Sequence, residues 1–82
     1  MHDLKWSKRS KKDLKGLERA LVLRIVQKVE SIRDIPYHFL EKLTDREEWK
    51  LRVGDYRVFI EIDEGSKMLN VLHVENRKKA YK

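Results

Sequence analysis

The chain contains no cysteine among its 82 residues. Disulfide bonds, thiol catalysis and cysteine-ligated zinc are therefore excluded, and a reducing cytoplasm is the compartment that this composition fits. No apolar run approaches the roughly 18 residues of a membrane-spanning helix, and the first residues, MHDLKWSKRS, lack the apolar segment of a signal peptide. These absences predict a soluble, cytoplasmic protein.

The length of 82 residues fits a single domain, residues 1–82, with a thin core. Charged side chains make up 41% of the chain, and the formal net charge is +6. Such an excess of positive charge favours a polyanionic partner, which is a nucleic acid, an anionic membrane or an acidic protein. The charge alone does not choose among these three.

The first half of the chain has the pattern of a strand followed by two helices. Residues 2–6, HDLKW, alternate polar and apolar side chains, as in a short strand. A short basic helix is expected over residues 8–17, and a longer amphipathic helix over residues 19–33, where apolar side chains recur at helical spacing. The run DIP at residues 34–36 ends this helix, because the residue before a proline resists the α conformation.

The second half predicts a loop and then an antiparallel meander. Residues 37–47 are expected to form the loop, and the strands cover residues 48–53, 56–63 and 68–75. The last strand is apolar at both odd and even positions, which suits a central strand with both faces partly covered. The expected fold is α+β: an N-terminal strand and a two-helix hairpin packed on one face of a four-stranded, mainly antiparallel sheet (β-α-α-β-β-β).

Alternation in the first two strands of the meander assigns their side chains to two faces. The helices are expected to cover the face formed by Trp49, Leu51, Val53, Tyr56, Val58, Ile60 and Ile62. The opposite face then keeps Lys50, Arg52, Arg57, Phe59 and Glu61. Across a two-residue turn at Gly54-Asp55, Arg52 lies directly opposite Arg57, and like charges so placed destabilise a sheet by up to about 1 kcal/mol. Either an anion belongs beside this arginine pair or the turn is of another type.

Cationic side chains gather on the face opposite the helices. Lys50, Arg52 and Arg57 share it, and Arg77, Lys78, Lys79 and Tyr81 follow from the end of the neighbouring strand. An RNA backbone needs cations for its phosphates and its bases need rings for stacking, so we expect RNA-binding roles for Arg52, Lys78 and Lys79. The alternative is a solvated face whose charges pair with Glu61, Asp63 or Glu75.

The three histidines give no metal-site pattern, because His2, His38 and His73 are scattered without the spacing of metal ligands. His73 shares the parity of Glu75 and Arg77, which places it near the cationic face. The pattern favours a surface or packing role for His73 over a catalytic one. We expect no metal and no other cofactor.

Two motifs resemble the signature of the RelE toxins in the RelE/ParE superfamily: WKLRVGDYRVFIEI and, further along the chain, VLHVENRKKAY. The expected strand, helical hairpin and meander resemble that family in order and length as well. The resemblance implies a toxin of a type II toxin-antitoxin pair, namely a ribosome-dependent mRNA endoribonuclease (mRNA interferase) that inhibits translation by cutting mRNA in the ribosomal A site. It also implies cleavage without a metal, by attack of the ribose 2′-OH on the adjacent phosphate.

The family's functional residues map onto Lys50, Arg52, Arg57, Arg77 and Tyr81. Arg57 is then expected to hold the phosphate, with Arg52 supporting it. Arg77 would hold the leaving oxygen, and Tyr81 would stack on a base or assist proton transfer. Some members carry a further lysine where this chain has Glu48, so the general base is either Lys50 or Glu48.

The resemblance implies a RelB-like cognate antitoxin, with a heterotetramer as one form of the complex. The ribosome and mRNA are the other expected partners, and a membrane is not one. Neutralisation would mask Lys50, Arg52 and Arg57, displace the tail at residues 77–81, or make the toxin too bulky for the A site; tail displacement is slightly favoured. Two other functions stay open: a non-enzymatic inhibitor of DNA gyrase like the ParE branch, and an RNA-binding module that has lost cleavage.

Overall fold

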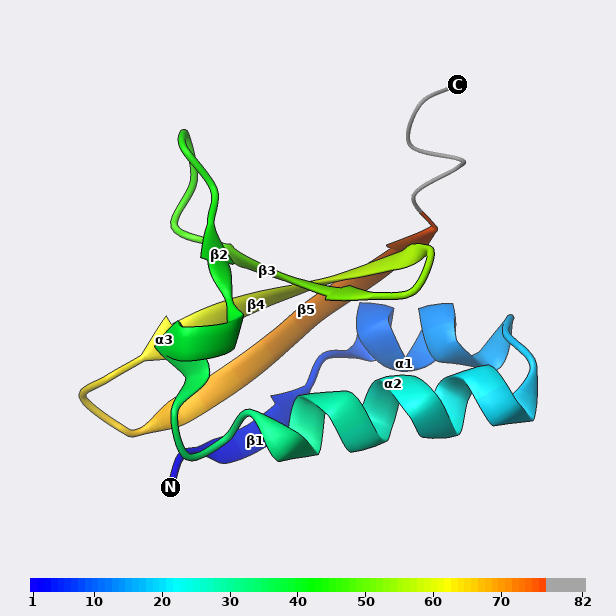
Figure 1. Cartoon of the computed structure of the whole chain (residues 1–82), viewed down its shortest axis with the longest axis horizontal. Coiled ribbons are helices and arrows are strands. Elements are labelled where there is room, and N and C mark those ends of the chain that lie inside the picture. Colours follow the sequence, from blue (N-terminus) through cyan, green and yellow to red (C-terminus); the bar gives the residue numbers. More distant parts are fainter. Residues whose placement is uncertain (77–82) are drawn as a thin grey trace.

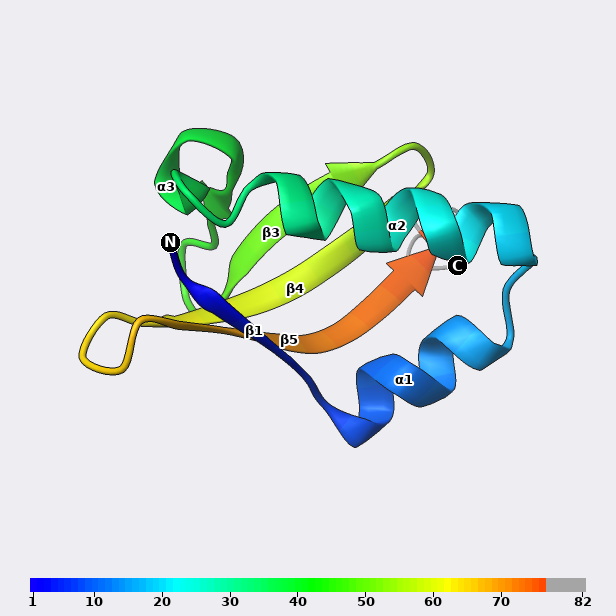
Figure 2. The same ribbon diagram turned by 90° about the horizontal axis from the view of Figure 1, so that it is seen from below.

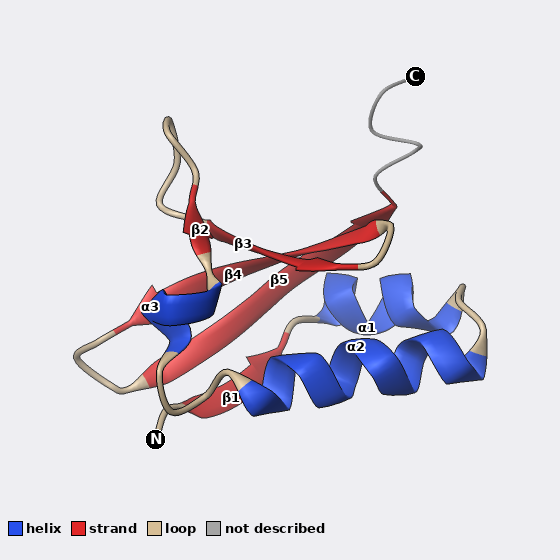
Figure 3. Ribbon diagram, in the orientation of Figure 1, coloured by secondary structure: helices blue, strands red, loops and turns tan. Residues whose placement is uncertain are grey.

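The computed structural model describes residues 1–76 of the chain. Its elements are β1 (Asp3–Trp6), α1 (Lys8–Lys15), α2 (Arg19–Ser31), α3 (Pro36–Phe39), β2 (Glu41–Lys42), β3 (Trp49–Val53), β4 (Tyr56–Asp63) and β5 (Met68–Asn76). The strands form one sheet in the order β1-β5-β4-β3-β2, in which β1 runs parallel to β5 and the other pairs are antiparallel. Figure 1 and Figure 3 show α1 and α2 below the sheet, with the segment between β2 and β3 rising on the other side.

This architecture confirms the predicted α+β fold with its helical hairpin and meander. The described part of the sheet has five strands, however, and not four. The extra strand is β2, in which Glu41 and Lys42 pair with Lys50 and Trp49 of β3. The expected loop at residues 37–47 therefore contains β2 and most of α3, a single turn that begins at Pro36, where the fixed φ of proline suits a first helical position. Neither element is long enough to show a periodic pattern.

The core lies between α2 and one face of the sheet. Ile25, Val29 and Ile32 are fully buried where the helical spacing predicted an apolar stripe. They belong to one cluster with Leu40, Leu51, Val53, Val58, Ile60, Leu69, Val71 and Val74, against which Trp6 and Trp49 pack. Viewed from below, α2 crosses the sheet and α1 lies beside β5 (Figure 2). The alternation in β3 and β4 thus predicted the buried face correctly.

The turn between β3 and β4 fixes the register of the meander. Gly54 has a φ of 58°, in the left-handed region that the first position of a two-residue hairpin turn requires. A Cβ at Gly54 would also lie 3.2 Å from Nη1 of Arg24, so a side chain there would press on α2. The turn is of the predicted type, and Arg52 stands directly opposite Arg57.

β5 contains a bulge at Leu72. Phe59 pairs with His73, but the next residue of β4, Ile60, pairs with Val71, so Leu72 is an extra residue on β5. The bulge shifts the alternation, and Val71 before it and Val74 after it both join the core. This shift, rather than coverage of both faces alone, explains why β5 is apolar at odd and even positions. His73 faces away from the helices and stacks on Phe59.

α1 satisfies the backbone of β5 beyond the end of β1. The last residue of β1 pairs with Val71, and past this point α1 takes over. The Oγ of Ser7 donates to the carbonyl oxygen of Leu72 at 2.6 Å, and the Val74 amide donates to Oδ2 of Asp13 at 2.9 Å. The same Ser7 Oγ caps α1 by accepting from the Ser10 amide. α1 therefore holds the two residues that flank His73.

A polar cluster joins the N-terminus to the turn between β4 and β5. The Nε2 of His2 lies 2.6 Å from Oε1 of Glu64, and Nε of Arg33 donates to the His2 carbonyl oxygen at 2.8 Å. Lys67 also bonds Glu64, at 3.1 Å between Nζ and Oε2. The contacts of Glu64 with His2, the larger influence, and with Lys67 lower its pKa from 4.5 to about 2.

Replacing Glu64 by glutamine should flatten the response of stability to acid. Since the pKa of Glu64 is lower in the folded protein, its carboxylate stabilises the fold above pH 4.5 and loses this contribution as the pH falls towards about 2. The unfolding free energy of the wild type, measured by urea denaturation, should therefore fall more steeply over this range than that of Glu64→Gln. The control is Glu61→Gln, which changes another exposed carboxylate. Equal slopes for the wild type and Glu64→Gln would contradict the assigned role.

Candidate functional site

Two rows of side chains cross the sheet on the face opposite the helices. Lys50, Phe59 and His73 are cross-strand partners from β3, β4 and β5, and so are Arg52, Arg57 and Glu75. Partners directly opposite in adjacent antiparallel strands share a face, so these side chains form one surface. We call these six residues the charged face. Its three cations are Lys50, Arg52 and Arg57, the residues that the alternation predicted there.

Arg57 lies at the centre of its row. Its Nη2 is 3.6 Å from Oε2 of Glu75, and its guanidinium lies 5.8 Å from the centre of the Phe59 ring. Its Nε is buried and has no hydrogen-bond partner among residues 1–76. A buried donor without a partner is unfavourable by roughly 1–3 kcal/mol, so this nitrogen is suited to an acceptor such as a phosphate oxygen.

The two other cations of the charged face differ in their partners. Arg52 is exposed and forms no ion pair within the described part of the chain. The Nζ of Lys50 lies 3.6 Å from Oε2 of Glu41, which β2 brings alongside β3. The solvated-face alternative is thus right for one pair, Arg57 with Glu75. The like-charged arginine pair itself is compensated on the Arg57 side.

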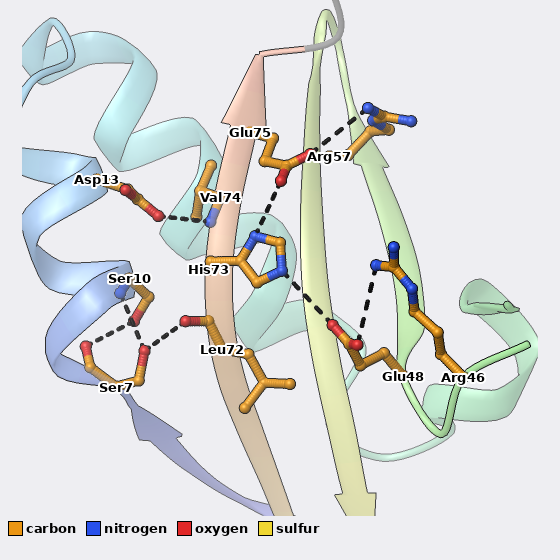
Figure 4. A network of polar contacts seen from close by, with 10 residues as sticks. All are labelled: Ser7, Ser10, Asp13, Arg46, Glu48, Arg57, Leu72, His73, Val74 and Glu75. Carbon is orange, nitrogen blue, oxygen red and sulfur yellow. Dashed lines mark hydrogen bonds and ion pairs between the residues drawn. The ribbon is translucent and has the colours of Figure 1, made fainter. Parts of the chain in front are cut away.

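His73 is the most enclosed polar residue of the charged face, at 9% exposure. Its ring stacks on Phe59 with the ring centres 4.3 Å apart and an angle of 15° between the planes. Its Nδ1 lies 3.4 Å from Oε1 of Glu75, and its Nε2 lies 3.5 Å from Oε1 of Glu48. Glu48 Oε2 is in turn 4.0 Å from Nη1 of Arg46. The result is a network of five polar residues, in the order Arg46, Glu48, His73, Glu75 and Arg57 (Figure 4).

Sequence reasoning missed this network of five polar residues. It placed His73 near the face but favoured surface or packing roles, and it offered Glu48 as a candidate general base. The structure pairs Glu48 with His73 and Arg46 instead, while Lys50 pairs with Glu41. The one sequence feature that pointed to this network was that His73 and Glu75 are two positions apart in a strand, which places them on the same face. The position of the segment before β3 depends on β2, which gave no signal.

A pocket of about 330 Å³ opens beside Arg57. Residues 43–46 form one wall, and Arg57, Phe59 and Glu75 form the other. This volume is at the lower end of the range for small-ligand sites, roughly 300–1,000 Å³. The pocket therefore has room for a small anionic group next to the Arg57 guanidinium.

Four predicted site residues lie outside the described residues: Arg77, Lys78, Lys79 and Tyr81. Their predicted roles stay predictions. Within residues 1–76, no group of three or more histidine, aspartate or glutamate side chains is placed to hold a metal ion. No helix in that same range has the length and apolar content needed to cross a bilayer.

Replacing Arg57 by alanine should leave the fold stable. The change relieves repulsion from Arg52, which is worth up to about 1 kcal/mol, and removes a partly exposed ion pair with Glu75, worth about 0–1 kcal/mol. We expect the unfolding free energy, measured in urea, to change by less than about 1 kcal/mol. Val58→Ala, at a fully buried position of the same strand, should lose about 2 kcal/mol or more. A loss of that size in Arg57→Ala would show that Arg57 supports the fold.

Comparison with known proteins gives one family. The model of the ParE toxin of the type II toxin-antitoxin system, parDE, matches residues 4–81. This range includes every strand and helix of the structure except the first residue of β1. No curated protein sequence matches the chain.

Solved structures share the fold. The toxin-antitoxin complex RelBE2 from Mycobacterium tuberculosis contains a chain with a TM-score of 0.86 and 19% identity, covering 93% of this chain and 98% of that one. The RelB-RelE antitoxin-toxin complex from Methanococcus jannaschii gives a TM-score of 0.74 and 25% identity, with 93% of each chain covered. The chromosomal ParDE system from P. aeruginosa gives 0.75 and 18% identity, covering 93% and 96%. Both RelE and ParE structures thus resemble this chain.

Proposed function

The chain belongs to the ParE toxin family of type II toxin-antitoxin systems, within the RelE/ParE superfamily, and we propose that it is a toxin that cleaves mRNA on the ribosome. The observation that carries this proposal is the buried Nε of Arg57, which has no hydrogen-bond partner in residues 1–76 and lies beside a small pocket on the charged face. A phosphate group of RNA is negatively charged, and its oxygens are acceptors for this N–H donor.

The proposed reaction is attack of a ribose 2′-oxygen on the adjacent phosphorus. The new bond closes a 2′,3′-cyclic phosphate while the bond to the 5′-oxygen breaks, and the 2′-OH proton leaves to a base as the 5′-oxygen gains one. Negative charge builds up on the phosphate oxygens during this step. Arg57 would bind these oxygens through its guanidinium group, Nε included. Arg52, directly opposite on β3, would add a second cation.

Glu48 fits the role of general base better than Lys50. The Nζ of Lys50 lies 3.6 Å from the Glu41 carboxylate, and an ammonium has no free electron pair with which to accept a proton. Glu48 is an ionisable carboxylate on the same face, held by contacts to His73 and Arg46. Lys50 then contributes positive charge near the RNA backbone.

Arg77 and Tyr81 complete the proposal on the strength of the sequence motif. Arg77 would hold the leaving 5′-oxygen, and Tyr81 would stack on a base or assist proton transfer. Lys78 and Lys79 would bind the RNA backbone. Asn76 ends β5 opposite Tyr56, so these residues follow directly in sequence after the charged face.

We propose a RelB-like antitoxin as the partner that neutralises this toxin, and the cytoplasm as its location. The Mycobacterium tuberculosis and Methanococcus jannaschii structures are themselves complexes of toxin with antitoxin. In this chain, an acidic antitoxin segment would be attracted by the net charge of +6. A heterotetramer is one form that such a complex would take.

A second candidate function is inhibition of DNA gyrase without RNA cleavage. It is favoured by the family model itself, which describes the ParE toxin, and by the likeness to the ParDE system. Two cations of the charged face also have carboxylate partners already, Lys50 with Glu41 and Arg57 with Glu75. The two candidates differ in the molecule attacked, so a pair of assays separates them.

The deciding experiment incubates the purified chain with translating ribosomes and maps the mRNA ends. We expect cleavage within codons at the A site, and a loss of about 100-fold or more in Arg57→Ala, as for removal of one donor to a developing oxyanion. Arg19→Ala is the matched control, because it removes the same charge from an exposed position on α2. Normal cleavage by Arg57→Ala would place the site elsewhere. Inhibition of gyrase supercoiling without mRNA cleavage would support the second candidate.

The variants Arg77→Ala and Tyr81→Phe should lower the rate of cleavage more than the affinity for ribosomes. Contacts made only in the transition state change turnover and not binding. Single-turnover cleavage at saturating ribosome concentration, together with ribosome cosedimentation, measures the two quantities. Weaker cosedimentation with an unchanged single-turnover rate would make these residues anchors of the complex.

A further inference from the structure

We infer that anion binding at Arg57 is coupled to protonation of His73 through Glu75. The inference deepens the proposed function, since it concerns the site where the RNA phosphate would bind. It assigns to His73 the role of a positioning residue, which acts through Glu75 and Glu48 and does not touch the phosphate. The ligand class is a phosphate-like oxyanion.

The coupling follows from a shared carboxylate. One oxygen of Glu75 lies 3.6 Å from Nη2 of Arg57, and its other oxygen lies 3.4 Å from Nδ1 of His73. An anion that approaches Arg57 therefore meets the negative charge of Glu75 beside it. A stronger interaction of the Glu75 carboxylate with His73 weakens its interaction with Arg57, and Arg57 is then more available to the anion.

The number of protons on the ring decides how far His73 can do this. A neutral imidazole has one N–H donor, whereas the protonated ring has two and a positive charge. Glu75 and Glu48 lie on opposite sides of the ring, facing Nδ1 and Nε2. The protonated ring can hold both carboxylates, but the neutral ring leaves one without a donor. The Nδ1 of His73 is buried and has no hydrogen-bond partner within residues 1–76, although Oε1 of Glu75 lies 3.4 Å away.

The charged groups near the ring come from several elements of the fold. Glu75 lies on β5, the strand that contains His73. Arg57 is on β4, and Glu48 and Arg46 come from the segment before β3. On β3, Lys50 is the partner of Phe59, on which the ring stacks. At the α1 side, Asp13 accepts from the amide of Val74, the residue that follows His73.

Charge balance gives the direction of the effect. Arg57 and Arg46 carry two positive charges, and Glu48 and Glu75 carry two negative ones. These five residues, His73 included, therefore have no net charge when His73 is neutral. A bound oxyanion adds negative charge to a partly buried site, where interactions are screened less than in water. A proton on His73 restores the balance. Anion binding should therefore take up a proton, and the anion should bind more tightly at low pH.

The experiment follows the Arg57 Nε–H signal by NMR during titration with sulfate, which carries the same charge throughout the pH range used. In the wild type we expect sulfate to shift this signal and to bind at least about fivefold more tightly at about pH 5 than at about pH 8. His73→Gln should bind at both pH values with the wild-type affinity of about pH 8. Glu75→Gln should bind more tightly than the wild type at about pH 8, with a weaker dependence on pH.

His38→Gln is the matched control, because His38 is an exposed histidine on α3. It should keep the wild-type dependence on pH. The inference is overturned if the wild-type affinity is the same at both pH values, if His73→Gln keeps the full dependence, or if sulfate leaves the Arg57 signal unmoved. Should His73→Gln fail to fold, Glu75→Gln tests the same coupling from its other end.

Failure of the inference and failure of the proposed function give different results. The sulfate titration uses the free protein and needs no ribosome. A chain that shows proton-linked sulfate binding but does not cleave mRNA would refute the nuclease and keep the coupling. A chain that cleaves mRNA but binds sulfate equally at both pH values would do the reverse.

Discussion

The pairing of β4 with β5, including the extra residue Leu72, is the constraint on which the rest of this structure depends. It allows Val71 and Val74 to enter the same core, although residues three positions apart in a regular strand face opposite sides of the sheet. The residue between them that pairs with Phe59, His73, is thereby turned to the opposite face. A bulge is stable only where its freed backbone groups find partners, and Ser7 and Asp13 supply these beside Leu72 and Val74. α1 thus positions the charged face from the other side of the sheet.

The charged face combines repulsion with compensation. Arg52 and Arg57 repel each other across the strands, and the stability of the fold comes instead from the apolar cluster beneath them. Glu75 on β5 reduces this repulsion by pairing with Arg57, and Glu41 on β2 pairs with the third cation, Lys50. These carboxylates are near their cations at 3.6 Å, which is longer than a direct charged hydrogen bond. Such loose pairs lose little when an anion takes the place of the carboxylate.

Much of the fold was predictable because its long elements have clear periods. The apolar stripe of α2 and the alternation in β3 and β4 are repeated over several residues, and Gly54 marks the turn that sets Arg52 against Arg57. The surroundings of His73 were not predictable. They depend on a single-residue bulge and on β2, a pair of residues that joins the sheet only because β3 is already in place. Shared parity brought His73 to the correct face, but parity says nothing about which carboxylates reach it from another segment.

Since RelE and ParE structures both resemble this chain, the fold by itself does not decide what the toxin attacks. The decision rests on side chains that the common backbone presents. A surface that only docks on a protein gains nothing from the buried Arg57 Nε, which has no partner within the described residues 1–76, and an unpaired donor lowers stability. A site that binds a phosphate uses this nitrogen each time the substrate enters. The arrangement of Arg57, its exchangeable partner Glu75 and the histidine behind that partner is therefore more readily understood as an anion site than as a docking surface.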